Sequence, residues 1–515
     1  MMNSVFDAIS TYAKQDPIRE AIVSANRTVS YAELNIQVNQ LSAELIQMKI
    51  QRLAIWGVNS VNWILVDLAA RKAGITVIPI PLFFTRDQVK HLLQDSQVDS
   101  ICVTDTGGDI EEKCGKKNCA IPEWLMNLTE HAGRRDVSTS DAFSGQFIHL
   151  LDHQKNPEQG DIKLNPAQQP SKITYTSGST GTPKGVCLVE ETIDSITASL
   201  SHALESSHLG RHLCLIPFAT LLENIAGIYV ALSMGRSVVV EEVSQFGLIS
   251  NHEFNVQYFV DAVRKYQIES VIFLPQMLKA IVEYIAEHGS ADFATLKFIA
   301  VGGGKVSPDL LSQCQRLNLP VYEGYGLSEC ASVVSLNLPN ARKIGSVGRI
   351  LPHVEVKIKQ NGEVVVKGNA MLGYVNDMAV SPYIHTGDAG YFDEEGYLYI
   401  TGRIKQIIVS SFGRNISPEW VESNSLNEPE IQQIAIFGEA QPYLSAVVYA
   451  KASTSDDGVA AAIQKANARM PDYAQIKHWC RAADPFSLKN KMLTDNGKLR
   501  RNQIKQHFDA ALLQS

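Results

Sequence analysis

The sequence predicts an α/β protein in which a large N-terminal domain of α/β layers precedes a smaller α+β domain. With 515 residues, the chain is too long for a single hydrophobic core. Helical apolar spacing alternates with short apolar strands over most of the chain, and the hydrophobic period changes to two after about residue 340. We therefore expect a large domain over residues 1–404, with a β-rich part at about 340–404 that forms a small β-barrel or a sheet, and a separate domain over 405–515.

The first part of the chain, up to about residue 105, predicts βαβ units and a largely parallel sheet. Residues 31–41 carry apolar side chains at helical spacing, and 53–58 form a short apolar run with a glycine near its end. Residues 106–170 are more polar and lack a strong period, which favours loops and one edge element. The α/β pattern resumes at Lys172 and continues through apolar strands at 271–274 and 298–301.

The β-rich part and the C-terminal tail have their own local signals. Val354, Val356 and Ile358 alternate with charged residues, and Asn361-Gly362 predicts a tight hairpin turn before the next apolar alternation. Within the compact tail, Ser417 followed by Pro418 predicts the start of a helix. The tail is short enough to be a mobile lid.

Composition excludes several classes of protein. The formal charge of −8 gives no basic footprint for nucleic acid, and the N-terminus lacks the pattern of a secretory signal. The apolar stretch 212–235 is interrupted by polar residues and by Pro217, so it predicts strand, turn and helix rather than a transmembrane segment. Eight scattered cysteines fit a reducing, cytoplasmic location. Cys114 and Cys119 leave a metal site open as an alternative, without a second pair nearby.

The most informative segment is the run 174–186, which predicts a phosphate-binding loop. Glycines there let main-chain N–H groups approach an anion, hydroxyl groups add donors, and Lys184 adds positive charge. The residues concerned are Thr176, Ser177, Gly178, Ser179, Thr180, Gly181, Thr182, Lys184 and Gly185. It is not a Walker sequence. A flexible surface linker is the alternative, but the ending Pro-Lys-Gly-Val beside an apolar run is unlike a linker.

Residues 321–330 form a second motif, in which an aromatic residue lies between glycines. A planar base can stack close to the backbone at Gly324, Tyr325 and Gly326, and the Glu329 carboxylate can hold Mg²⁺. The alternative for Glu329 is a carboxylate favoured by a helix start. Upstream, Gly302, Gly303 and Gly304 follow an apolar strand, where a ligand can approach the main chain at the edge of a sheet.

A third motif pairs Thr-Gly-Asp, ending at Asp388, with Gly-Arg-Ile-Lys, which contains Arg403. The carboxylate can accept two ribose hydroxyl groups, and the guanidinium can donate to ribose or phosphate. Taken alone, Thr-Gly-Asp is a common turn.

Together these motifs resemble those of the acyl-adenylate-forming (AMP-binding) superfamily, and they are nearest to those of fatty acyl-CoA synthetases. The resemblance covers nearly the whole chain and is weakest at 106–170. It implies an ATP-dependent acid–thiol ligase that uses Mg²⁺ and transfers an acyl group to CoA or to the phosphopantetheine thiol of an acyl carrier protein. The alternatives are an adenylate-forming enzyme that closes a β-lactone or amide, and a nucleotide-binding protein without catalysis.

The resemblance also implies roles for single residues. Lys498, in a motif similar to the terminal Thr-x-x-Gly-Lys-x-x-Arg, bridges the substrate carboxylate and the α-phosphate, and Lys184 and Glu329 complete the catalytic set. Tyr325 lies against adenine, Ser328 touches the α-phosphate, and Thr176 joins Glu329 at the metal. Lys405 is the hinge between domains, and Gly413 lines the thiol tunnel. The intact Lys498, Glu329 and Lys184 argue against a binding-only protein.

Departures from the family pattern bear on the acid substrate. Thr220 and Glu190 stand where many members have His, which makes CoA less certain as acceptor. An Asp that would hold the ammonium group of an amino acid is missing. We therefore expect an apolar acid, such as a medium- or long-chain fatty acid, in an acyl pocket formed by Phe218, Thr220, Leu221, Gly302 and Gly304.

Overall fold

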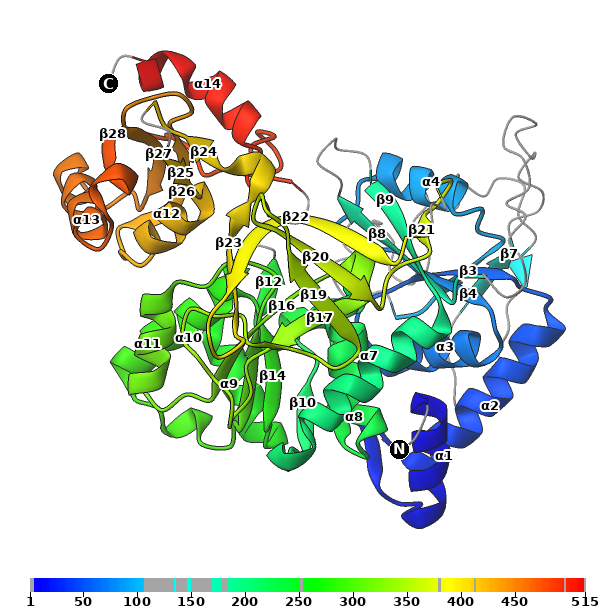
Figure 1. Ribbon diagram of the computed structural model, residues 1–515. Coiled ribbons are helices and arrows are strands. Elements are labelled where there is room, and N and C mark those ends of the chain that lie inside the picture. Colours follow the sequence, from blue (N-terminus) through cyan, green and yellow to red (C-terminus); the bar gives the residue numbers. More distant parts are fainter. Residues whose placement is uncertain are drawn as a thin grey trace.

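The computed structural model describes nine segments of the chain, namely residues 4–105, 134–135, 146–149, 169–177, 183–250, 253–377, 381–411, 414–494 and 497–513. Two large sheets with their helices form the N-terminal part, and a small antiparallel sheet lies between them and the C-terminal domain (Figure 1). This arrangement confirms the predicted fold class.

The first large sheet has eight strands in the order β21-β9-β8-β4-β3-β5-β7-β6. Its centre is parallel, and α3 and α4 make the crossovers between β3, β4 and β5, as the early alternation predicted. The short strands β6 and β7 form the expected edge element. Bounds are β3 Arg52–Trp56, α3 Val61–Lys72, β4 Thr76–Pro79, α4 Arg86–Asp95, β5 Ser100–Val103, β6 Arg134–Arg135, β7 Gln146–His149, β8 Lys172–Ser177, β9 Pro183–Leu188 and β21 Gly373–Tyr374.

The second large sheet has nine strands in the order β18-β17-β16-β15-β14-β10-β11-β1-β2. Its strands are β1 Glu20–Val23, β2 Thr28–Ser30, β10 Arg211–Leu213, β11 Ser237–Val239, β14 Ser270–Phe273, β15 Phe298–Val301, β16 Val321–Leu327, β17 Ser332–Leu336 and β18 Arg349–Ile350. A small hairpin, β12 Leu248–Ser250 with β13 Glu253–Phe254, lies apart from it.

Helices cover these sheets and enclose two main apolar cores. Their bounds are α1 Val5–Gln15, α2 Tyr31–Gln47, α7 Glu190–Ala203, α8 Val230–Ser233, α9 Val256–Tyr266, α10 Pro275–His288 and α11 Pro308–Arg316. The apolar stretch 212–235 is strand β10, then a π-helical segment η3 (Leu222–Tyr229), then α8. Among the described residues, no helix is long and apolar enough to span a membrane.

The predicted β-rich part is an open antiparallel sheet of order β19-β20-β22-β23 rather than a closed barrel, because its two outer strands do not pair with each other. The hairpin prediction is confirmed, since Val356 pairs with Val366 and Gly362 has φ of +81° in the turn. Bounds are β19 Val354–Ile358, β20 Glu363–Gly368, β22 Tyr383–Phe392 and β23 Leu398–Arg403.

The C-terminal domain is an α+β unit around the sheet β26-β27-β28 (Figure 1). Ser417 caps α12 by accepting a hydrogen bond from the Trp420 N–H, and Pro418 is the first helical residue, as predicted. Bounds are β24 Ile408–Val409, β25 Asn415–Ile416, α12 Pro418–Ser425, β26 Ile431–Phe437, β27 Leu444–Ala450, α13 Asp456–Ala468, β28 Ile476–Arg481 and α14 Arg501–Leu513.

Candidate active site

Two predicted phosphate and metal residues, Lys184 and Glu329, meet at a tyrosine that sequence reasoning missed. The Lys184 Nζ lies over the Tyr374 ring, 5.2 Å from its centre, and the Tyr374 hydroxyl donates a hydrogen bond of 2.8 Å to Glu329 Oε1. Strand β21 places Tyr374 beside β9, and Thr176 on β8 is in register with Lys184. The signal noticed at Tyr325, an aromatic residue followed by glycine, is absent at Tyr374, where Val375 follows.

Asp388, Arg403 and Tyr325 form a second cluster. The Tyr325 hydroxyl donates to Asp388 Oδ2 at 2.5 Å, and the Arg403 Nε lies 2.8 Å from Oδ1. Strands β22 and β23 pair Asp388 with Arg403, and the Thr386 hydroxyl accepts the Asp388 N–H at 3.0 Å. The ribose and adenine residues predicted from separate motifs therefore lie together.

Burial raises the pKa of Asp388, while the charge of Arg403, the hydrogen bond from Tyr325 and, more weakly, the charge of Lys498 act in the opposite direction. Lys498 belongs to the C-terminal domain and is exposed, and its N–H donates to Thr494 Oγ1 at 3.0 Å.

Glycines bring the backbone close together at the carboxyl edge of β15 and β16. A Cβ at Gly326 would lie 1.6 Å from the carbonyl oxygen of Ser332 on β17, so a side chain cannot fit there. A Cβ at Gly302 would lie 3.3 Å from the Gly324 carbonyl oxygen. Gly303 has φ of +76°, which favours glycine. The two glycine motifs therefore line one edge, where a planar group can reach the main chain.

The residues expected in the acyl pocket differ in how deeply they are buried. Phe218 is 1% exposed and packs on Trp63, with ring centres 5.2 Å apart, so its side chain is part of the apolar core rather than an open surface. Thr220 is half-buried at the entrance to η3, and Leu221 is buried beside it. Glu190, one of the departures from the family pattern, forms an ion pair of 2.5 Å with the buried Arg71.

Comparison with known protein families identifies the family of this chain. Residues 9–375 match the model described as AMP-binding enzyme, and residues 405–514 match the model described as AMP-binding enzyme C-terminal domain. The chain belongs to the AMP-binding enzyme family.

This AMP-binding enzyme is similar to oxalate–CoA ligase of Arabidopsis thaliana, with 25% identity over 97% of this chain and 98% of that protein. It is also similar to a mitochondrial medium-chain acyl-CoA ligase of Mus musculus, with 25% identity over 84% of this chain and 76% of that protein. Its fold is that of the o-succinylbenzoate coenzyme A synthetase of Bacillus subtilis solved with ATP and magnesium ion, with a TM-score of 0.72, 21% identity, and coverage of 97% and 99%.

Some predicted residues of the AMP-binding enzyme lie outside the described segments. These are Gly178, Ser179, Thr180, Gly181, Thr182, Gly413 and the alternative metal pair Cys114 and Cys119, together with the side chain of Ser177. Lys405 is exposed in the short helix Ile404–Gln406, which follows β23 and precedes β24.

Proposed function

We propose that this AMP-binding enzyme is an ATP-dependent acid–thiol ligase that forms an acyl adenylate. The observation that supports this most is that Tyr325, Asp388 and Arg403, which come from separate motifs, meet in one hydrogen-bonded cluster of the large domain. The terminal motif adds Lys498, which a protein that merely bound a nucleotide would not need.

In this proposal the nucleotide lies along the glycine edge of β15 and β16. Tyr325 and Gly302 to Gly304 contact adenine, and Asp388 and Arg403 hold the ribose. The ribose hydroxyl groups then share Asp388 with the Tyr325 hydroxyl, which already contacts one carboxylate oxygen. The phosphates extend to Thr176, Lys184 and Ser328, where hydroxyl and ammonium groups donate hydrogen bonds.

The residues present fit a magnesium ion. Glu329 is half-buried, and its Oε1 is held by Tyr374, which fixes the direction of a carboxylate whose second oxygen can face the phosphates. Mg²⁺ usually takes one or two protein carboxylates and leaves its other positions to phosphate and water. Glu329 would hold the ion with the Thr176 hydroxyl, and the ion when bound would neutralise phosphate charge.

Two half-reactions follow from this placement. A carboxylate oxygen of the acid attacks the α-phosphorus, the bond to the β-phosphate breaks, and pyrophosphate leaves. Lys498 stabilises the charge that develops between the carboxylate and the α-phosphate. A thiolate then attacks the acyl carbon, the thioester forms, and AMP leaves. CoA is the acceptor supported by the two CoA-ligase relatives, and a carrier-protein thiol has the same chemistry.

For the acid, we propose an apolar compound, a medium- or long-chain fatty acid. Charged groups near η3 are already paired inside the protein: Glu223 with His212 at 2.8 Å, and Lys172 with Asp67 at 2.7 Å. Glu223 and Lys172 therefore offer no free partner to the ammonium group of an amino acid or to the second carboxylate of oxalate. The medium-chain acyl-CoA ligase relative agrees with this choice.

The deciding experiment measures kcat/KM by pyrophosphate release for straight-chain acids of two to sixteen carbons, oxalate, benzoate and the standard amino acids, with and without CoA. Each buried CH₂ should add about 0.8 kcal/mol, so kcat/KM should rise several-fold per methylene until the pocket ends. A preference for oxalate or an amino acid would overturn the fatty-acid proposal. Release that does not depend on added CoA would favour β-lactone or amide closure instead.

A further inference from the structure

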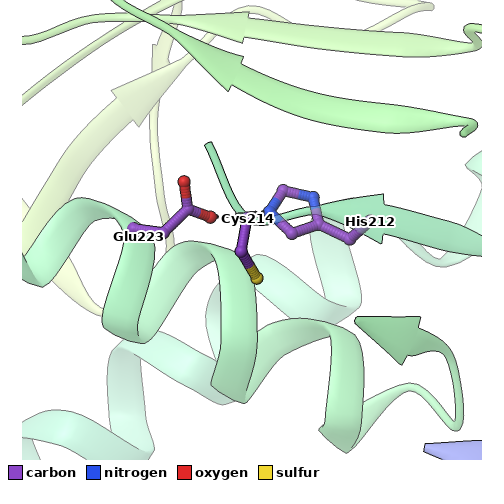
Figure 2. Close-up of side chains that lie close together, drawn as sticks. All are labelled: His212, Cys214 and Glu223. Atoms are coloured by element: carbon purple, nitrogen blue, oxygen red, sulfur yellow. Dashed lines mark hydrogen bonds and ion pairs between the residues drawn. The ribbon is translucent and has the colours of Figure 1, made fainter. Parts of the chain in front are cut away.

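Three buried side chains of the kinds that bind metal ions lie close together in the core and take no part in the proposed chemistry. His212 and Cys214 come from β10 and the residue after it, and Glu223 comes from η3, which packs against them (Figure 2). His212 is 6% exposed, and the other two are fully buried. One ligand atom of each lies within 4.8 Å of the other two.

His212 and Glu223 also contact neighbouring groups through their second polar atoms. His212 Nε2 faces Glu223 Oε1 at 2.8 Å, while Nδ1 is 3.1 Å from the Ser270 hydroxyl. Glu223 Oε2 accepts a hydrogen bond of 2.9 Å from the Ile216 N–H, so Oε1 is the oxygen that faces His212. Ligating histidines and carboxylates in metal sites are held by such second hydrogen bonds.

Cys214 is the third side chain of this group. Its thiol is free and has no hydrogen-bond partner among the residues that the structure describes. Thiolate is the form of cysteine that binds metal ions, and metal binding releases the thiol proton.

The backbone of Gly227 packs directly against the Glu223 and His212 side chains. A Cβ at Gly227 would lie 2.2 Å from Glu223 Oε1 and 2.8 Å from His212 Nε2, so only glycine fits beside the pair. Gly227 and Glu223 are both on η3. Turns of π-helix are rare in proteins overall, but many of those that occur lie at functional sites.

We propose that His212, Cys214 and Glu223 bind a zinc ion. One nitrogen, one sulfur and one carboxylate ligand suit zinc, and neutral His with thiolate and carboxylate balances its two positive charges in an apolar core. Ligand atoms on a tetrahedral zinc are roughly 3.3–3.8 Å apart, so the present spacing needs an adjustment of about 1 Å or less. The ion would tie β10 to η3 and so fix the segment that carries Phe218 and Thr220.

The competing account is a buried His–Glu pair that needs no metal, and metal content separates the two. Wild-type protein dialysed against zinc and then against zinc-free buffer should retain close to one zinc ion per chain by mass spectrometry. Cys214→Ala, a small change in the core, should retain at least tenfold less. Cys102→Ala is the matched control, because Cys102 is equally buried, on β5.

Cobalt(II) provides a second measurement that does not depend on the stability of a variant. Added to metal-free wild-type protein, it should give the near-ultraviolet absorption of a cobalt–thiolate bond, unchanged in Cys102→Ala. Wild-type protein without retained zinc and without this band would overturn the site, and so would zinc retention in Cys214→Ala equal to that of the wild type. Neither measurement uses ligase activity, so failure here leaves the proposed function untouched.

Discussion

At the scale of single residues, the ionisable groups of the candidate active site are oriented by partners from other strands. Asp388 is held on one side by Tyr325 and on the other by Arg403, and Glu329 is held by Tyr374. Hydrogen bonds to charged groups contribute more than neutral ones, so each partner fixes a carboxylate before any ligand arrives. Lys498 differs, because it is exposed on the C-terminal domain.

Lys498→Ala should lower acid-dependent ATP–pyrophosphate exchange by about 100-fold or more, because the charge that develops at the α-phosphate loses its stabilising cation. Thioester formation from supplied acyl adenylate should continue. Lys505→Ala, an exposed lysine on α14, is the control and should behave as wild type. Normal exchange in Lys498→Ala would contradict the assignment.

Glu329→Gln should raise the Mg²⁺ concentration needed for half-maximal adenylation by roughly tenfold, because a neutral amide is a weaker ligand for a hard cation. Tyr374→Phe should produce a smaller increase, since it removes the 2.8 Å hydrogen bond to Glu329 but keeps the ring beneath Lys184. The measurement is a Mg²⁺ titration at saturating ATP. An unchanged titration in Glu329→Gln would show that other groups hold the ion.

At the scale of elements, a buried polar network connects β8 to α3 and η3. Lys172 is 0% exposed, and its Nζ donates to Asp67 at 2.7 Å, to Tyr229 at 2.9 Å and to Asn224. Burial lowers the pKa of Lys172, and Asp67 opposes that shift. The network fixes the start of the strand that leads into the predicted phosphate loop.

Lys172→Met should reduce the free energy of unfolding by about 3–5 kcal/mol, because it leaves the Asp67 carboxylate buried without its cation. Adding Asp67→Asn should recover part of the loss, since the amide keeps hydrogen bonds to Tyr229 and Asn224 without a charge. Lys367→Met, which breaks a half-exposed pair with Glu355, should cost much less. Urea unfolding of the four proteins tests this order, and equal losses in the single and double variants would refute it.

At the scale of the whole molecule, the two domains meet through polar contacts. Asn427 donates to the Ser307 hydroxyl at 2.8 Å, and Arg469 forms a 3.2 Å ion pair with Asp309 in which both side chains are partly exposed. Such exposed pairs contribute little to stability. This supports the prediction that the C-terminal domain moves about Lys405 between the two half-reactions.

Gly413→Leu should leave adenylation intact and block thioester formation, because the resemblance places Gly413 in the thiol tunnel after domain rotation. Lys498→Ala should show the reverse pattern. The two variants are compared by ATP–pyrophosphate exchange and by thioester formation from supplied acyl adenylate. Equal loss of both activities in either variant would contradict alternating use of the C-terminal domain.

Sequence alone determined the features that depend on neighbouring residues. The turn at Asn361-Gly362, the helix start at Ser417-Pro418 and the βαβ alternation were predictable because turn, cap and period signals act over a few residues. The motifs around Tyr325 and Asp388 also pointed to one chemistry, although they are far apart in the chain.

Tertiary structure decided which distant segments became neighbours. Tyr374 joins Lys184 to Glu329, Arg71 takes Glu190 as its partner, Phe218 enters the core, and Glu223 turns towards His212 and Cys214. No local pattern encodes these contacts, because a hydrophobic period selects the buried face of an element but not the element that packs against it. That choice is made when the cores close, and the partners of buried polar side chains follow from it.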